Sequence, residues 1–293
     1  MTQPPDLATA LADLPFPLPP GRLAGGDDDG QQPLLWVSDG PTPAGLWARL
    51  HRAHPQSGLW PLLLSPLHSD ADEDYRPWLS GELYPNEAST VDLYDPAALL
   101  RTWWAMNGAD EDEDGDGNDE DGNDEDGNDG DDGDGEADGE DEDETLAPYG
   151  RTWPGRAPAA TVPEGAAGVE ARGLADVLQS VKHVRIGLVR AGSGAEALAA
   201  CGWGGPVNHE NDIAKVAAVL ADWERRFGAQ VVEAGFDTLE LSVPVPPATL
   251  AEALPLAAEH TAFCPDLVFQ GAGSLTAYAE GLVGMHQWSF WWD

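Results

Sequence analysis

Residues 213–243 read IAKVAAVLADWERRFGAQVVEAGFDTLELSV, and this stretch decides the fold class. Apolar side chains recur at helical spacing through its first half, and Gly228 follows where a helix would end. Leu239, Leu241 and Val243 then alternate with polar residues, as in a strand with one buried face. The stretch therefore predicts a long helix followed by a β-hairpin.

Two short apolar runs lie on either side of a helical pattern earlier in the chain. The runs cover residues 34–38 and 59–64, and the helical pattern covers residues 44–54. A strand, a helix and a strand joined by short links predict parallel pairing through a right-handed crossover. Similar patterns predict helices at 95–104, 169–181 and 195–201, helices starting at Thr249 and Ser274, and a strand at 184–189.

The chain ends on HQWSFWWD, residues 286–293. In a strand, Trp288, Phe290 and Trp292 fall on one face, and Trp291 falls on the other. Aromatic side chains on both faces are typical of an inner strand between layers of helices. The sequence therefore predicts a mixed α/β fold, with helices packed on a mostly buried mixed sheet and the C-terminal strand inside that sheet.

The charge of the chain is strongly negative and unevenly distributed. The 53 acidic and 14 basic residues give a net charge of -39, and residues 109–144 hold 23 of the acidic residues and no Lys or Arg. An acidic surface repels phosphate backbones, so we expect no nucleic-acid partner. It also offers no basic patch to an anionic membrane, so we expect no membrane partner.

The composition divides the chain into five segments. We expect an N-terminal segment at 1–30 that is mobile apart from a short helix at 7–14, a first α/β segment at 31–107 and a disordered acidic insert at 108–146. A linker rich in Pro and Ala follows at 147–167, and a second α/β segment covers 168–293. We expect the two α/β segments to form one globular unit with the insert looping out, and two separate domains are the alternative.

The cellular compartment can be predicted from cysteine usage and from the N-terminus. Two cysteines, Cys201 and Cys264, cannot form a disulfide framework. No basic residue precedes Arg22, so no signal peptide is recognisable, and no apolar run approaches the ~20 residues of a membrane helix. These features predict a cytoplasmic protein, and the excess of Arg over Lys is typical of a GC-rich bacterial genome.

A first candidate site lies in the sequence EHTAFCPD. His260 and Cys264 are four residues apart, so they share one face of a helix, and Asp266 follows closely. A Cys–His pair can act as nucleophile and base, which makes these three residues catalytic candidates. The alternative is a helix end with a buried thiol, because free cysteines are among the most often buried residues.

A second candidate site is the loop GWGGPVNHEND, residues 202–212. It combines glycines with polar and aromatic side chains before a rigid helix, and its binding candidates are Trp203, Asn208, His209 and Asp212. The alternative is that the polar residues cap the helix. Neither candidate site holds a metal-ligand set, and no cofactor is predicted.

A third candidate is the turn RAGSGAEALA. Gly192, Gly194 and Ala197 fit a loose G-x-G-x-x-A pattern between a strand and a helix, where a helix N-terminus can hold a phosphate. The predicted helix is only about two turns long, and no acidic residue follows at a strand end. Nucleotide binding is therefore a second alternative function.

The C-terminal part of the sequence resembles a known family. The runs WERRFGAQVVEAGFDTLELSV, AAEHTAFCPD, YAE and WSFWWD resemble bacterial domain of unknown function 4253, which is common in actinomycetes. The resemblance covers residues 184–293 and extends less specifically to LLWVSDG and LWPLLL in the first half. It implies a bacterial habitat and a shared organisation, and it implies no activity.

These observations favour a binding or protein-interaction module of the adaptor or immunity kind. The catalytic motifs are weak, and an acidic surface suits a basic protein partner. The alternatives are a hydrolase that uses Cys264 and His260, and a nucleotide-binding domain at 192–197. The sequence makes no prediction of the oligomeric state.

Overall fold

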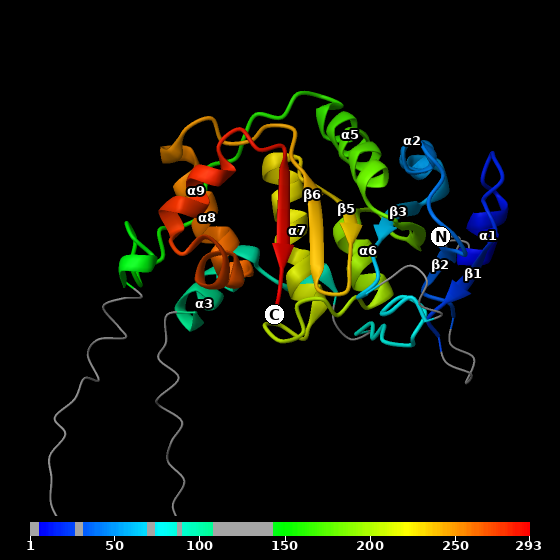
Figure 1. Cartoon of the computed structure of the whole chain (residues 1–293), viewed down its shortest axis with the longest axis horizontal. Coiled ribbons are helices and arrows are strands. Elements are labelled where there is room, and N and C mark those ends of the chain that lie inside the picture. Colours follow the sequence, from blue (N-terminus) through cyan, green and yellow to red (C-terminus); the bar gives the residue numbers. More distant parts are fainter. Residues whose placement is uncertain (1–5, 27–31, 69–73, 87–89, 108–142) are drawn as a thin grey trace, which may run out of the picture.

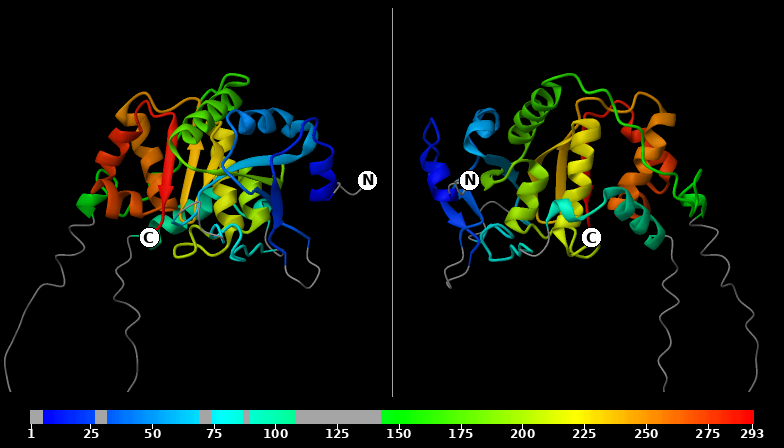
Figure 2. Two further views of the ribbon diagram at one scale, coloured as in Figure 1. Left: turned by 45° about the vertical axis from the view of Figure 1, so that its right-hand side comes forward. Right: turned by 180° about the vertical axis from the view of Figure 1, so that it is seen from behind.

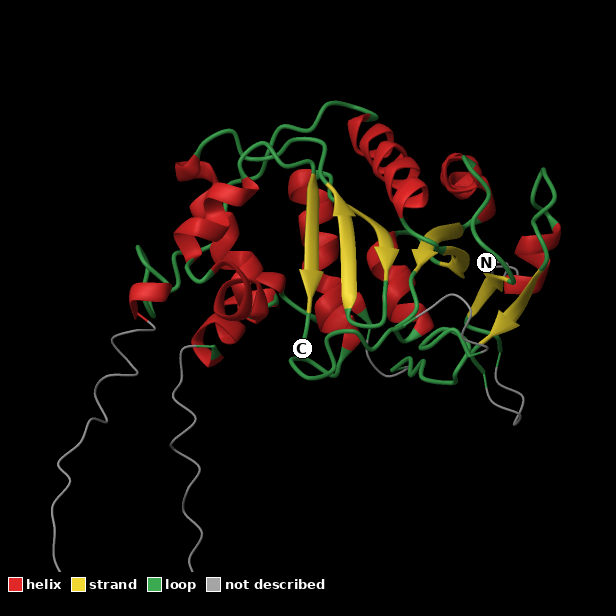
Figure 3. Cartoon of the chain, in the orientation of Figure 1, coloured by secondary structure: helices red, strands yellow, loops and turns green. Residues whose placement is uncertain are grey.

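The computed structural model describes residues 6–26, 32–68, 74–86, 90–107 and 143–293. Its fold is mixed α/β, with helices on both faces of one seven-stranded sheet (Figures 1 and 3). The predicted acidic insert at 108–146 lies outside the described residues, except for its last four. The predicted fold class is confirmed.

The sheet has the strand order β1-β2-β4-β3-β5-β6-β7. Its strands are β1 (Gly21–Ala24), β2 (Leu35–Ser38), β3 (Leu59–Leu64), β4 (Arg185–Arg190), β5 (Gln230–Ala234), β6 (Thr238–Ser242) and β7 (Gln287–Trp291). Neighbouring strands are antiparallel, except that β3 and β5 are parallel. Strands from before and after the acidic insert therefore hydrogen-bond in one sheet.

Helices cover the sheet in two layers. The helices are α1 (Leu7–Ala12), α2 (Leu46–Ser57), η1 (Val91–Leu93), α3 (Pro96–Met106), α5 (Ala166–Val181), α6 (Gly194–Cys201), α7 (Ile213–Phe227), α8 (Leu250–Phe263), the π-helical η3 (Leu267–Ala272) and α9 (Leu275–Leu282). Side chains of α1, α2 and α5 form the core on one face, and side chains of α3, α6, α7, α8 and α9 form it on the other. Figure 2 shows α6 and α7 against the second face.

The predicted crossover between the first two apolar runs is wrong in one respect. Strands β2 and β3 point the same way, but β4 lies between them and is antiparallel to both. Leu62 of β3 faces Gly187 of β4, more than a hundred residues along the chain. The strand–helix–strand pattern predicted correctly that β2 and β3 point the same way. Which strand lies next to each of them depends on pairing between segments that are far apart in the sequence.

The predicted inner position of the C-terminal strand is also wrong. Strand β7 pairs with β6 and stands last in the strand order, so it is an edge strand. Trp288, Phe290 and Trp292 are buried as predicted, whereas Ser289 on the other face is exposed. These rings are buried by helices on one face and beside the edge, where α8 and α9 lie (Figure 1). Burial of one face does not require a strand on both sides.

The N-terminal segment contributes more than predicted. Residues 1–30 were expected to be mobile apart from a short helix, and the helix α1 forms with Asp6 as its N-cap. Strand β1 was not predicted, because GRLA is short and holds a glycine and an arginine. It pairs with β2 and becomes the other edge of the sheet.

Helix starts agree closely with the sequence. Side chains of Asp95, Ser193, Asp212, Thr249 and Ser274 each accept a hydrogen bond from a backbone N–H in the first turn that follows. Among the described residues, no helix is long and apolar enough to cross a membrane.

Candidate functional site

The proposed catalytic pair lies in the core beside β7. Cys264 ends α8, and its Sγ donates to the carbonyl oxygen of Trp291 at 2.9 Å. Burial raises the pKa of the Cys264 thiol to about 12. Burial, together with the nearby charge of Arg226, lowers the pKa of His260 to about 3, and His260 Nδ1 lies 3.0 Å from Tyr278 Oη. A neutral thiol and a neutral imidazole, both fully buried, do not favour nucleophilic catalysis.

The carboxylate of Asp266 accepts hydrogen bonds at the chain terminus and not from Cys264 or His260. Its Oδ2 accepts from the backbone N–H of Asp293 at 3.0 Å, and its Oδ1 accepts from Gln270. Asn208, from the predicted binding loop, donates to the Asp293 carbonyl oxygen at 3.2 Å. The two sequence candidates therefore meet at Asp293, where their hydrogen bonds fix the end of the chain.

The other predicted loop residues have separate surroundings. Trp203 is buried and donates from Nε1 to the Gly235 carbonyl oxygen at 2.7 Å. Asp212 caps α7 and accepts from Tyr94 Oη. Burial lowers the pKa of His209, whose ring lies 5.6 Å from that of Trp103. Of the four candidates, His209 alone lines a cavity of about 330 Å³, beside α3.

The glycine-rich turn supports the packing of α6. Ser193 caps the helix, and Glu196 Oε2 accepts from the Gly192 N–H at 2.8 Å, so a carboxylate stands where a phosphate would bind. A Cβ on Gly194 would lie 2.7 Å from Val231 Cβ, which indicates that this glycine allows α6 to approach the sheet. These contacts do not favour a phosphate at this helix start.

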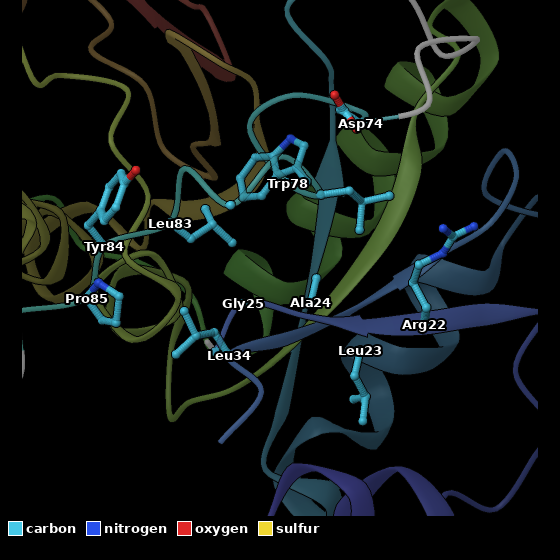
Figure 4. Close-up of a pocket in the computed structure, with 13 residues that line it drawn as sticks. Arg22, Leu23, Ala24, Gly25, Leu34, Asp74, Trp78, Leu83, Tyr84 and Pro85 are labelled. Carbon is cyan, nitrogen blue, oxygen red and sulfur yellow. The ribbon is translucent and has the colours of Figure 1, made fainter. Parts of the chain in front are cut away.

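A larger cavity, of about 650 Å³, lies beside the edge strand β1. Figure 4 shows it between β1 and the irregular segment 74–85. Ala24, Leu83 and Trp78 are buried at its base. The side chain of Tyr84 is 73% exposed at its mouth. The cavity thus combines an apolar base with a lining surface that is more polar than apolar, so it differs from the mostly apolar form of a small-molecule site.

Several hydrogen bonds attach segment 74–85 to the body of the protein, and three of them place its large side chains and its end. Tyr75 Oη donates to the Leu64 carbonyl oxygen at 2.6 Å, and Trp78 Nε1 donates to the Ser65 carbonyl oxygen at 2.9 Å. The Tyr84 N–H donates to the Gly202 carbonyl oxygen at 2.9 Å. These contacts join the cavity wall to the end of β3 and to the end of α6.

Gly202 is needed for the last of these contacts. Its φ is +70°, which disfavours any residue with a Cβ, and a Cβ here would lie 2.2 Å from the backbone nitrogen of Pro85. Gly202 therefore lets the cavity wall lie directly on the end of α6. It belongs to the predicted loop, although the sequence suggested contact with a ligand rather than with residues 84–85.

One residue of β1 points its backbone groups away from β2. The Asp39 N–H donates to the Pro20 carbonyl oxygen, next to the paired residues Gly21 and Ser38. Because hydrogen-bonded pairs alternate along an antiparallel ladder, Arg22 and Ala24 face β2 with their backbone groups, and Leu23 faces outward. In the strand order of the described sheet, no strand follows β1 on that side.

Sequence reasoning missed this site because its parts are far apart and individually ordinary. The apolar residues Trp78 and Leu83 lie in a segment with no helical or strand period, and β1 was not predicted. The succession of Tyr, Trp and Leu in YRPWLSGELYP was the available signal, since a solvent-exposed loop rarely holds so many large apolar residues. In the part of the chain that the structure describes, no group of His, Cys, Asp and Glu could hold a metal ion.

Comparison with known proteins places the C-terminal part of the chain in a family. No curated protein and no solved structure matches the chain. A family model described as a domain of unknown function (DUF4253) matches residues 185–293, which span β4 to β7. The cavity lies mainly on segments that precede this match, although its wall rests on Gly202 within it. Residues 185–293 of this chain are therefore a domain of the DUF4253 family.

Proposed function

We propose that the protein is a binding module that captures an extended segment of a partner protein along β1, as an adaptor or immunity protein would. The observation that carries the proposal is the position of the 650 Å³ cavity directly beside an outer strand. An extended peptide can add a strand to such an edge, where backbone hydrogen bonds supply affinity and a neighbouring pocket supplies specificity.

The geometry of β1 defines how a segment would bind. Arg22 and Ala24 pair with Val37 and Leu35, whose side chains lie in the core on the cavity side of the sheet. In an added strand, the residues opposite Arg22 and Ala24 point to this same side. The residue opposite Ala24 would enter the cavity between Leu34 and Leu83. Burial of one large apolar side chain contributes about 1.5–3 kcal/mol.

The length of the edge limits the interaction. Strand β1 has four residues, so only a short segment can pair with it. Leu23 is 43% exposed, and it offers a second apolar contact on the opposite face. We expect modest affinity, in keeping with a transient partner, because a short segment also loses conformational entropy on binding.

The experiment uses the full chain and an array of ten-residue peptides rich in β-branched residues. Peptides that bind are measured in solution with the wild type and two variants. Leu23→Pro removes the outward-facing N–H and leaves the pairing of β1 with β2 intact, because proline is tolerated on the free side of edge strands. Leu23→Ala is the matched control, which shortens the side chain and keeps the N–H.

The expected result is that Leu23→Pro abolishes peptide binding and Leu23→Ala weakens it at most a few-fold. Equal binding by both variants would show that the segment does not pair with β1, and would contradict the proposal. An array on which no peptide binds would contradict it too. A folded state common to all three proteins is checked by their circular dichroism spectra.

The hydrolase hypothesis makes a different prediction about Cys264. A catalytic thiol would react rapidly with iodoacetamide in the native protein. We expect instead that native Cys264 is alkylated only at the rate at which the protein unfolds, because the thiol is buried and its pKa is raised to about 12. Rapid, selective alkylation of Cys264 at pH 7 would favour the hydrolase over the binding module.

A further inference from the structure

The cavity beside β1 has two chemically different ends. Figure 4 shows Arg22 and Asp74 toward one side, and Leu34, Leu83 and Pro85 toward the other. Ala24 and Trp78 lie between them. A segment lying along β1 therefore passes from a charged region to an apolar one within a few residues.

The charged end carries a net negative charge. The guanidinium of Arg22 is bound by Asp39, with Nη2 2.7 Å from Oδ1, so its charge is balanced. Asp74 is exposed, and among the described residues no partner contacts its carboxylate. The chain as a whole has a net charge of -39. A cation at this end gains from Asp74 and from the field of the whole chain, whereas an anion is repelled by both.

We propose that the segment bound along β1 carries a basic side chain two residues away from the apolar side chain that enters the cavity. This inference rests on the proposed function. Residues two apart in a strand point to the same face, so the residue opposite Ala24 fills the apolar end and the residue opposite Arg22 lies at the end that Asp74 lines. The partner is thus a basic protein with an exposed extended segment.

The order of the two residues follows from the direction of the added strand. The described neighbours of β1 and β2 are antiparallel, and antiparallel pairs outnumber parallel pairs about two- to threefold in proteins. Strand β1 runs from Arg22 to Ala24. An antiparallel segment therefore presents its apolar residue first and its basic residue second, in the pattern apolar-x-basic.

A second copy of this chain is the other occupant to consider. An outer strand can pair with its own copy about a twofold axis. Two chains of net charge -39 repel each other, and the residue opposite Arg22 would then be a residue of β1, whose only basic side chain is already bound by Asp39. Charge complementarity therefore favours a basic partner over self-association.

The test uses three fluorescein-labelled ten-residue peptides that differ at their centre: Leu-Thr-Lys, Lys-Thr-Leu and Leu-Thr-Glu. Their dissociation constants are measured with the full chain by fluorescence anisotropy at low and at physiological salt. We expect Leu-Thr-Lys to bind about three- to tenfold more tightly than Leu-Thr-Glu at low salt, and the ratio to shrink as salt screens the charges. Asp74→Asn is expected to reduce this ratio, while Leu23→Pro abolishes binding of all three peptides.

The outcomes separate the two proposals. If peptides bind in a Leu23-dependent way but show no preference for Lys, the basic residue is wrong and the function stands. A preference for Lys that Asp74→Asn leaves unchanged would overturn the placement of the basic residue beside Asp74. Tighter binding of Lys-Thr-Leu would overturn the antiparallel order. A concentration-dependent dimer that Leu23→Pro dissociates, seen by sedimentation, would identify a second copy as the occupant. If none of the peptides binds, both proposals fail.

Discussion

The two edges of the sheet are built in opposite ways. At one edge, β7 packs Trp288 and Phe290 into the core, and the end of α8 hydrogen-bonds to the strand and to the residue after it. At the other edge, three of the four residues of β1 are exposed, and a cavity lies next to it. The first edge is closed by large side chains and a helix, whereas the second is limited only by its short length.

The difference shows that the two edges of one sheet can be treated independently: the edge at β7 is covered, whereas the edge at β1 is left without a cover. Native proteins cover an edge, shorten it or charge it, because a free edge pairs with other chains. Covering β7 buries apolar area and adds stability to the fold. Shortening β1 leaves its backbone groups accessible and adds little stability. Stability and binding are therefore expected to respond to changes at different edges.

The largest effect is expected from removing the covered edge. A chain that ends at Met285 lacks β7 and Trp292, and replacing one buried aromatic residue by Ala already costs about 3–5 kcal/mol. Three such residues amount to about 9–15 kcal/mol, which is comparable to the whole stability of a typical domain, about 5–15 kcal/mol, so we expect no cooperative thermal transition by calorimetry. A truncated chain that still unfolds in one sharp transition would show that β7 is dispensable.

The next effect concerns the helix that covers β7. The carboxylate of Glu259 on α8 is fully buried, and it accepts from Arg226, from Trp223 Nε1 at 2.8 Å and from the Ala157 N–H at 2.6 Å. Glu259→Ala removes the acceptor of Trp223 Nε1 and of the Ala157 N–H and leaves Arg226 with Asp222 as its remaining carboxylate, and we expect a loss of about 3–5 kcal/mol in urea unfolding. Exposed Glu252 on the same helix is the control, and Glu252→Ala is expected to cost about 1 kcal/mol or less.

Gly202→Ala tests the wall of the open edge. The new Cβ meets the backbone of Pro85 at a positive φ, so we expect a loss of about 2–3 kcal/mol together with loss of peptide binding. Gly204→Ala is the matched control, because space around Gly204 is open. Normal peptide binding by Gly202→Ala would show that segment 74–85 takes no part in capture.

A smaller effect is expected from lowering the pH. The folded pKa of His260, about 3, lies below the ordinary 6.5, so the unfolded state takes up the proton first and stability falls as the pH drops below about 6.5. Between pH 7 and 5, protonation of His260 in the unfolded state lowers the free energy of unfolding by about 2 kcal/mol. His51, with a pKa of about 4, adds a similar loss. The folded pKa of Glu224 is raised to about 7, so the folded protein takes up this proton first as the pH falls. This uptake stabilises the protein and offsets the loss caused by one histidine.

His260, His51 and Glu224 together thus give a net loss of about 2 kcal/mol between pH 7 and 5, and the lowered pKa of His209 adds to it in the same direction. Urea unfolding at several pH values measures it. His260→Gln lowers stability at every pH, and we expect it to flatten the dependence on pH. A slope that is unchanged in His260→Gln would assign the pH dependence to other groups.

The smallest effect on stability is expected at β1 itself. Leu23→Pro and Leu23→Ala each change one partly exposed side chain, so the free energy of unfolding is expected to fall by less than about 1 kcal/mol. The same Leu23→Pro change is expected to abolish peptide binding. A large loss of stability with Leu23→Pro would mean that the N–H of Leu23 has a partner within the fold, and the comparison of the two edges would then fail.

Local patterns in the sequence predicted most elements of the fold. The helix at 213–227, the hairpin at 230–242 and the N-caps at Asp95, Thr249 and Ser274 follow from periodicity and capping chemistry, which act within a few residues. The position of β4 between β2 and β3, and of β7 at an edge, depends on pairing between distant residues. The periodicity of apolar residues along the sequence does not reveal these positions.

The candidate sites were less predictable than the fold. The spacing of His260 and Cys264 places both on α8, but spacing does not reveal that aromatic rings surround His260 and remove it from water. The cavity beside β1 combines residues 22–26 and Leu34 with residues 74–85, and only their tertiary packing brings them together. Burial and long-range packing are the properties that are hardest to predict from a single sequence.

The interior position of β4 has a consequence for synthesis on the ribosome. Strands β2 and β3 emerge early, but the strand that joins them, β4, is translated more than a hundred residues later, at about 5–20 residues per second. The nascent chain thus carries β3 and one side of β2 without their partner strands for several seconds, while the acidic insert follows them out of the exit tunnel. We propose that the two segments fold as one unit, so that residues 1–150 translated alone are expected to be protease-sensitive until β4 is added.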